Sequence, residues 1–163
     1  MNRRFFLAVV PALLAVGCGL QLRRLDEVPF ASLHVDAPYD GAVAQRIRSA
    51  LTASKQTRLA ASAAEAEAVL VLGQETRSKT ILSLSGAGRV TEYRLGLQLT
   101  YGINDKDGRT LAAAETIELT RDITYDDAQV LAKSAEEQLL YRDMDDNAAR
   151  RIMRRLQSIG PGS

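Results

Sequence analysis

The chain has 163 residues, of which 46% are hydrophobic and 25% charged, the balance of one ordinary globular domain and not of a disordered chain. Its formal net charge is only +1, which excludes steering of the whole molecule toward nucleic acid or an anionic membrane. Aromatic residues make up 5% and tryptophan is absent, so the composition also argues against an aromatic stacking surface for single-stranded nucleic acid or sugar.

The first 17 residues have the features of an export signal. Arg3 and Arg4 form a short basic head, and an apolar stretch follows that is interrupted by Pro11 and is too short to span a bilayer comfortably. Small residues then precede Cys18, the only cysteine. We therefore predict a lipoprotein signal peptide over residues 1–17.

The segment Ala15-Val16-Gly17-Cys18 resembles the bacterial lipobox, in which a lipid is attached to the cysteine and cleavage occurs just before it. The resemblance implies that Cys18 is the lipidated first residue of the mature protein, and the alternative is a leader whose cysteine is incidental. Acyl chains would make Cys18 a membrane anchor. Gly19 in place of Asp resembles an outer-membrane address, and we interpret residues 18–31 as a lipidated tether.

The remaining chain predicts one α+β domain over residues 32–159, followed by a flexible tail over 160–163. A short strand is expected at Ser32–Asp36, and a helix capped by Asp40 over Gly41–Lys55, since Val43, Ile47 and Leu51 recur every four residues.

The middle of the chain predicts three consecutive antiparallel strands. Ala68–Leu72 is a buried apolar run whose pattern continues toward Leu84, and glycines then form a turn over Ser85–Gly88. Strict alternation of apolar and polar residues predicts a long strand over 89–103. A turn is expected at 104–108, followed by another strand over Thr110–Ile123.

The last element is a helix. The spacing of Ser134 and Glu137 is that of a capping box, although helical structure can begin near Asp127. One strand, one helix, three strands and one helix together predict a two-layer sandwich: a four-stranded, mostly antiparallel sheet with two helices on one face.

The residues needed for catalysis are nearly missing. His34 is the only histidine and lies in a predicted strand, where a structural role is expected. Glu136 and Glu137 are adjacent on a helix and point in different directions, which suits a helix start better than paired acid and base chemistry. We therefore predict no enzyme, no metal site and no cofactor apart from the lipid on Cys18.

Basic residues are the remaining candidates for a binding site. Lys133 precedes the expected helix start, where the helix dipole does not stabilise a cation. Arg77, Lys79 and Arg89 lie near the turn at Ser85–Gly88 and could form a rim that attracts phosphate, or only a soluble hairpin tip. The arginines of segment 150–155 could also bind phosphate, but they are typical of a solvated helix end.

Several segments together resemble the LptE family of lipopolysaccharide-assembly lipoproteins, in order over essentially the whole mature chain. These are Cys18-Gly-Leu-Gln-Leu-Arg23, Gly88-Arg-Val-Thr-Glu-Tyr93, Arg121-Asp-Ile-Thr-Tyr-Asp126, Leu131-Ala-Lys133 and Glu136-Glu137 through Tyr141-Arg-Asp-Met144. The resemblance implies the same sandwich, with a four-stranded sheet and two helices on one face.

The resemblance also implies a function. Members of the family plug the lumen of the outer-membrane β-barrel LptD and bind lipopolysaccharide (LPS) during its delivery to the cell surface. It implies an outer-membrane location on the periplasmic face, with LptD and LPS as partners and no nucleic acid. Lys133 matches the family lysine of the LPS site, whereas the family arginine position is Gly86 here, which leaves Arg89 as the candidate replacement. The alternative function is a lipid-anchored periplasmic module that binds peptidoglycan or another envelope protein.

Overall fold

The computed structural model describes residues 28–159. The predicted signal peptide, Cys18 and the tail at 160–163 lie outside the described residues. The elements in chain order are β1 (Ser32–Asp36), α1 (Ala42–Ala53), β2 (Arg58–Leu59), the 3-10 turn η1 (Ala63–Glu65), β3 (Ala68–Leu72), β4 (Thr76–Leu84), β5 (Val90–Asp105), β6 (Thr110–Thr124), the 3-10 turn η2 (Asp127–Gln129) and α2 (Val130–Ser158).

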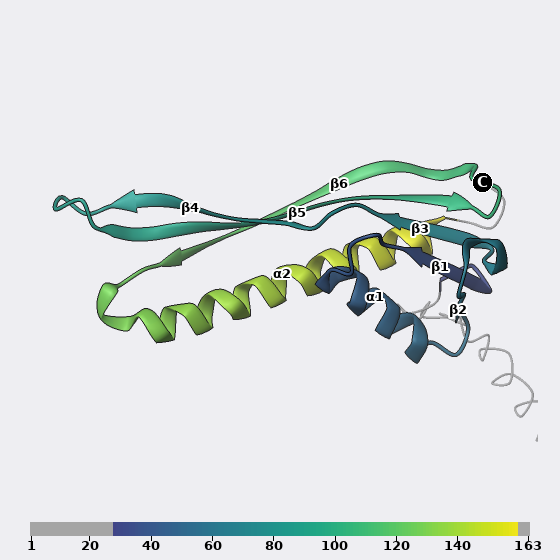
Figure 1. Cartoon of the computed structure of the whole chain (residues 1–163), viewed down its shortest axis with the longest axis horizontal. Coiled ribbons are helices and arrows are strands. Elements are labelled where there is room, and N and C mark those ends of the chain that lie inside the picture. Colours follow the sequence, from purple (N-terminus) through teal and green to yellow (C-terminus); the bar gives the residue numbers. More distant parts are fainter. Residues whose placement is uncertain (1–27, 160–163) are drawn as a thin grey trace, which may run out of the picture.

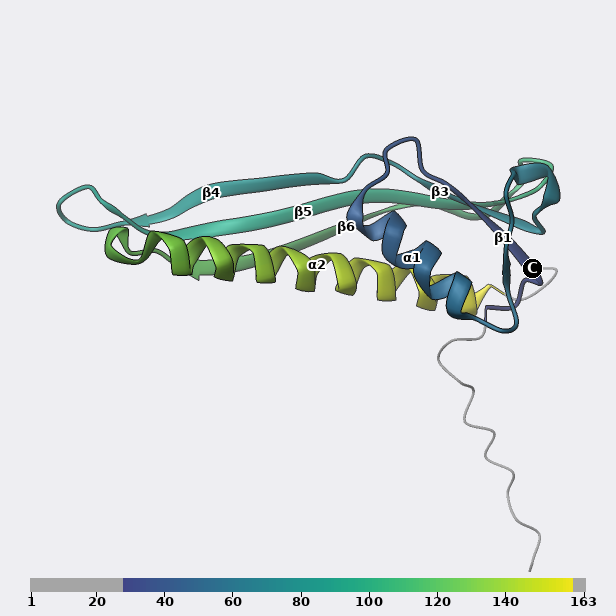
Figure 2. The same ribbon diagram turned by 60° about the horizontal axis from the view of Figure 1, so that its bottom comes forward.

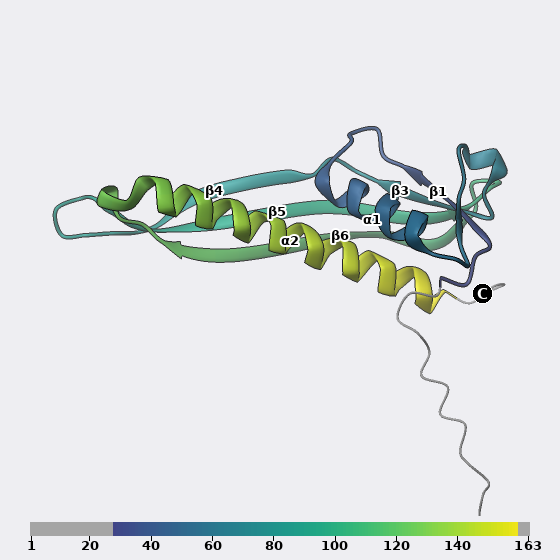
Figure 3. The ribbon, with the colours of Figure 1, turned by 90° about the horizontal axis from the view of Figure 1, so that it is seen from below.

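The described part of the chain is elongated, with a compact end and a long arm (Figure 1). The compact end contains β1, β2, β3 and α1, whereas the arm consists of β4, the adjoining lengths of β5 and β6, and the N-terminal half of α2. Both helices lie on the same face of the sheet, with α2 running along its length and α1 beside the C-terminal half of α2 (Figures 2 and 3). The helical layer therefore covers one face and leaves the other open.

The alternating pattern of β5 explains how the sheet meets this layer. Leu95, Leu97 and Leu99 are at most 2% exposed, whereas the intervening Arg94 and Gln98 are exposed. A period of two places successive side chains on opposite faces of a sheet. The predicted alternation is confirmed, and the apolar side chains of β5 form the core against the helices.

The predicted strand count is wrong, because the sheet has six strands instead of four. The strand expected from Ala68 toward Leu84 is divided into β3 and β4, which pair with successive stretches of the same edge of β5. Leu72 pairs with Tyr101 and Thr76 pairs with Gln98, so this strand contains one residue more than its partner across the break. An extra residue of this kind bulges out of the ladder and interrupts the pairing.

The sheet is also mixed at its compact end. Strand β1 pairs in parallel with the two-residue β2 and with β3, whereas β3, β4 and β6 all pair antiparallel with β5. Parallel neighbours require a crossover connection, which α1 supplies between β1 and β2. The expected α+β class with two helices on one face is confirmed, and the three consecutive antiparallel segments are found.

The helix α2 buries the apolar stripe expected from its sequence. Met144, Ala148, Ile152 and Leu156 recur at intervals of four and each has 0% exposure. The prediction that Ser134 caps this helix is wrong, whereas the alternative start near Asp127 is confirmed: the turn η2 begins at Asp127 and α2 follows from Val130. The Asp126 carboxylate accepts a hydrogen bond from the Ala128 amide at 2.9 Å and so caps η2.

The segment ahead of β1 also contributes to the core. Val28 and Phe30 are 6% and 5% exposed, and the Val28 carbonyl accepts a hydrogen bond from the Thr57 hydroxyl at 3.4 Å. The described chain therefore starts at the compact end, beside the end of α1. Within residues 28–159, none of the helices combines the length and apolar character needed to cross a membrane.

Candidate functional site at the end of the arm

Lys133 lies in the first turns of α2, where the helix meets the end of β6. Its ammonium donates to the Thr124 hydroxyl at 3.0 Å and to the Glu136 carboxylate at 2.9 Å. The side chain is 17% exposed, which shows that its aliphatic part packs against the arm. Lys133 is therefore positioned by two partners and keeps its charged end at the surface.

A second cation, Lys79 on β4, faces the same region. Its ammonium donates to the Glu137 carboxylate at 2.6 Å and lies 4.4 Å from the centre of the Tyr93 ring. The hydrogen bond from Lys79 to Glu137 raises the pKa of Lys79, and burial opposes this rise. Both the carboxylate and the ring face stabilise a cation here.

The two lysines share a small hollow with aromatic walls. Tyr93 and Tyr125 meet edge to face, with ring centres 5.2 Å apart. The hollow has a volume of about 210 Å³, and the side chains lining it include Lys79, Tyr93, Ile123, Tyr125, Lys133 and Glu137. It therefore combines apolar walls with two cations and one anion.

Arg89 lies outside this hollow, in the turn between β4 and β5. Its amide donates to the Ser85 hydroxyl at 3.2 Å, and its side chain is exposed with no ion pair among residues 28–159. Lys133 bonds Thr124 at the end of β6, and Thr124 pairs with Glu92 on β5. Lys133 therefore lies at the same height along the sheet as Glu92. Arg89 precedes Glu92 by about three residues, a separation of roughly 10 Å along a strand. Both predicted site residues thus lie at the end of the arm without touching.

Large apolar side chains are also exposed at this end of the arm. The exposed fractions are 58% for Ile81 and 56% for Leu84 near the tip of β4, and 88% for Leu131 at the start of α2. Exposed apolar groups gathered near cations favour a ligand that has both anionic groups and apolar chains. We refer to Lys79, Arg89, Lys133 and these three apolar residues as the arm-end surface.

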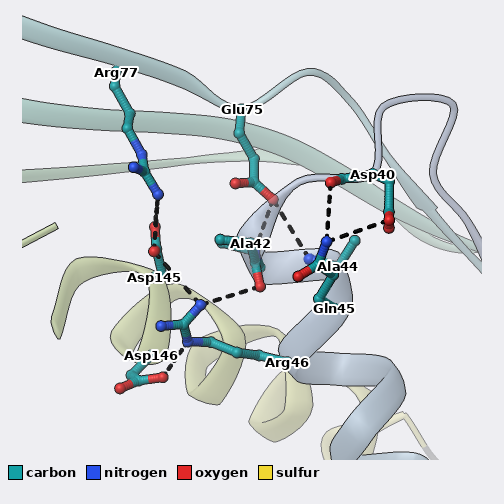
Figure 4. A network of polar contacts seen from close by, with 10 residues as sticks. Asp40, Ala42, Ala44, Gln45, Arg46, Glu75, Arg77, Asp145 and Asp146 are labelled. Carbon is teal, nitrogen blue, oxygen red and sulfur yellow. Dashed lines mark hydrogen bonds and ion pairs between the residues drawn. The ribbon is translucent and has the colours of Figure 1, made fainter. Parts of the chain in front are cut away.

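Arg77 does not belong to the expected rim, because it points to the middle of the molecule. Its guanidinium donates to both carboxylate oxygens of Asp145, at 3.0 and 2.9 Å, and Asp145 also pairs with Arg46 of α1 at 3.5 Å (Figure 4). Asp145 is 1% exposed. This network ties β4, α1 and α2 together where the arm joins the compact end.

Glu75, in the break between β3 and β4, replaces Asp40 as the cap of α1. Its carboxylate accepts hydrogen bonds from the amides of Val43 and Ala44 at 2.8 and 3.4 Å (Figure 4). No side chain of the N-cap residue Gly41 serves this role, and Asp40 instead pairs with Arg48. A carboxylate at a helix start satisfies free amides and complements the helix dipole.

Substituting Glu75 by Ala should therefore lower the free energy of unfolding by about 1 kcal/mol, the usual cost of losing a helix cap. Urea denaturation followed by circular dichroism measures this loss. Glu118→Ala is the matched control, because Glu118 is exposed on β6 and bonds only Gln98 among the described residues. An equal loss in both variants would contradict the capping role.

The open face of the sheet is polar and internally paired. Arg94 donates to both carboxylate oxygens of Asp122 at 2.8 and 2.9 Å, which lowers the pKa of that carboxyl group. Two further pairs follow along the strands, Gln98 with Glu118 at 3.1 Å and Thr100 with Thr116 at 2.9 Å. This face suits a hydrated polar environment and not an apolar one.

The remaining candidates show no catalytic or metal-binding arrangement. His34 makes a hydrogen bond through Nδ1 with the Ala60 carbonyl at 3.1 Å, a structural contact. Glu136 and Glu137 bond different lysines, Lys133 and Lys79. In the described part of the chain, no group of three or more His, Cys, Asp or Glu residues could hold a metal ion.

Two features of the site were missed from the sequence. The sequence patterns give no sign of the contact between Tyr93 and Tyr125, because Tyr93 lies in β5 and Tyr125 directly follows the end of β6, far away in sequence. Asp145 had a signal that could have been used, since it precedes Ala149 and Ile152 by four and seven residues and so falls within the apolar face of α2.

Comparison with known proteins identifies relatives along the whole described chain. The family model LptE, described as lipopolysaccharide-assembly, matches residues 30–156. The LPS-assembly lipoprotein LptE of Photorhabdus laumondii is 28% identical over 151 residues, which cover 90% of this chain and 81% of that protein.

Two solved lipoprotein structures share the fold. One is the solution structure of an uncharacterized lipoprotein B from Nitrosomonas europaea, 32% identical with a TM-score of 0.75, covering 82% of this chain and 86% of that one. The other is the crystal structure of the rare lipoprotein B from Shewanella oneidensis, 27% identical with a TM-score of 0.65, covering 78% of this chain and 94% of that one.

Proposed function

This chain belongs to the LptE family of non-enzymatic lipopolysaccharide-assembly lipoproteins, and from that premise we propose that it binds LPS and plugs an LptD-type β-barrel of the outer membrane. The observation that carries the proposal is the arm-end surface, where Lys79, Arg89 and Lys133 lie near exposed apolar side chains. LPS combines phosphates and carboxylates with acyl chains. A local amphiphilic surface on a nearly neutral domain matches this chemistry.

The open sheet face supports the plug role. Its exposed side chains are charged or hydroxylated and pair with one another across β5 and β6. The interior of an outer-membrane barrel is polar. A domain with such a face can enter a polar lumen without leaving apolar surface in contact with water.

The position of the chain start supports the proposed lipid anchor. Val28 lies at the compact end, where its carbonyl accepts a hydrogen bond from Thr57. About ten residues separate it from Cys18, and ten residues span at most ~35 Å when extended. The arm contains most of the 16-residue strand β5, whose full length is roughly 50 Å. A lipid on Cys18 would therefore hold the compact end near the periplasmic leaflet of the outer membrane, with the arm-end surface away from the anchor.

The variant Lys133→Glu tests LPS binding. Reversing this charge should weaken binding of purified LPS by about ten-fold or more, because a cation that pairs with phosphate becomes an anion that repels it. Binding is measured by titration of the soluble domain, with circular dichroism as the check on folding. Lys106→Glu is the control, since Lys106 is exposed in the turn between β5 and β6 at the other end of the sheet. Equal binding by both folded variants would remove Lys133 from the site.

Co-purification tests the plug role. The full-length lipoprotein, extracted from outer membranes in mild detergent, should be recovered with a large β-barrel protein. Recovery only as a free monomer would contradict the proposal. Crosslinking to cell-wall fragments in place of a barrel would favour a periplasmic module that binds peptidoglycan.

A further inference from the structure

The outer surface of the helical layer contains a groove between α1 and α2 at the compact end. It has a volume of about 730 Å³. Its apolar lining includes Ile47 of α1 and Ala149 and Met153 of α2. The groove is distant from the arm-end surface, since these residues lie on α1 and the C-terminal half of α2 (Figure 3).

The charged residues of this groove are mostly arginines. Arg46, Arg150 and Arg154 line it. Arg46 is neutralised by Asp145 and Asp146 (Figure 4). Arg150 and Arg154 are exposed, and their side chains make no hydrogen bond or ion pair within residues 28–159.

The surrounding helices offer no further counter-charge. α1 contains no acidic residue, and α2 contains none after Asp146. Asp146 is the one carboxylate that lines the groove, and it pairs with Arg46. Arg154 also lines a neighbouring hollow that contains Glu115 of β6. No ion pair links the guanidinium groups of Arg150 and Arg154 to either carboxylate, so both flank the apolar groove unpaired within residues 28–159. Guanidinium pairs best with planar carboxylates, which it binds through two parallel hydrogen bonds.

We propose that this groove, which we call the arginine groove, docks a carboxylate-bearing segment of the barrel partner. The proposal rests on the proposed plug function. Inside a barrel, the outer surface of the helical layer would face the lumen wall, and much of its contact with solvent would be lost. Removing an arginine from water without giving it a partner is strongly destabilising, so the wall would supply carboxylates to Arg150 and Arg154, which have no ion pair among residues 28–159. The apolar lining then receives an apolar side chain of the same segment.

The test compares two full-length charge-reversed variants in barrel co-purification. Arg150→Glu with Arg154→Glu should reduce recovery of the barrel by about ten-fold or more, and most of the wild-type complex should be lost as salt is raised. Lys106→Glu with Arg142→Glu is the control, because these exposed cations lie outside the groove and the change in net charge is the same. The control should recover the barrel as the wild type does.

The possible failures are distinguishable. If the wild type itself recovers no barrel, the proposed plug function fails. If the wild type and the groove variant recover it equally, the plug function stands and the arginine groove is overturned as its docking site. Unchanged barrel recovery with lost binding to vesicles containing phosphatidylglycerol would also overturn the proposal, because it would assign the groove to a membrane surface. Equal losses in groove and control variants would overturn it in favour of a general charge effect.

Discussion

Replacing Asp145 by Ala should lower the free energy of unfolding by about 2 to 3 kcal/mol at neutral pH. The substitution removes a carboxylate that is 1% exposed and bonded by Arg77 through both oxygens, with Arg46 as a second cation. Breaking a fully buried ion pair typically costs ~3–5 kcal/mol. The loss is smaller here because the side chains of Arg77 and Arg46 are 43% and 29% exposed and can be solvated.

Asp143→Ala is the matched control for this measurement. Asp143 is on the same helix and pairs with Arg121 at 2.8 Å, but its side chain is 52% exposed. Pairs of this kind contribute less than about 1 kcal/mol. Urea denaturation of both variants gives the comparison. Equal losses in the free energy of unfolding would show that the burial of Asp145 does not strengthen its ion pairs.

The pH dependence of Asp145 has a definite sign. Burial raises the pKa of this carboxyl group above its ordinary value, although Arg77 and Arg46 oppose the rise. A group with a raised pKa in the folded state binds its proton more tightly there. Its protonation therefore stabilises the fold fully below the unfolded pKa of about 4, and this contribution is lost as pH rises through the folded pKa.

Asp145→Asn isolates that contribution, because Asn has the same size and does not titrate. The difference in free energy of unfolding between wild type and Asp145→Asn should fall as pH rises from about 4 through the raised pKa. A difference that grows over this range would mean that the arginines outweigh burial.

Local patterns in the sequence were sufficient to predict both helices and the long strand β5. Apolar residues recur every four positions in α1 and α2 and alternate with polar ones in β5, because each element buries one face. These predictions are confirmed. The extra residue at Gly73–Glu75 divides a single strand, and no local pattern indicates it because it depends on register with β5. The cap of α1 was mispredicted for a similar reason, since Glu75 is about 30 residues away in sequence.

The site was less predictable than the fold. Lys133 and Arg89 were selected from family motifs, and the structure places both at one end of the arm. Their environment depends on contacts between segments far apart in sequence, such as Lys79 with Glu137. Arg77 shows the opposite case. Its closeness in sequence to the hairpin turn suggested a place in the rim there, but its guanidinium instead pairs with buried Asp145 in the middle of the molecule.

The arm presents a separate question of stability, because it is one thin layer of strands against a single helix. Leu95 has 0% exposure and lies in β5 between Lys79 of β4 and Arg121 of β6. Its side chain belongs to the same core cluster as Met144 and Ala148 of α2, so it lies on the face of the sheet that α2 covers. Leu95→Ala should lower the free energy of unfolding by about 3 kcal/mol, through lost burial and the cavity left behind.

The same variant should show where the stability is lost. If the arm opens as a local unit, the amides of β4 and of the paired lengths of β5 and β6 should lose protection from hydrogen exchange before those of β1 and β3. Ile81→Ala is the control, since Ile81 is 58% exposed on β4 of the same arm and should change stability by less than about 0.5 kcal/mol. Uniform loss of protection over the whole sheet would instead show that arm and compact end unfold together. In that case, the arm-end surface would be held as rigidly as the core, and ligand binding there could not depend on local opening of the arm.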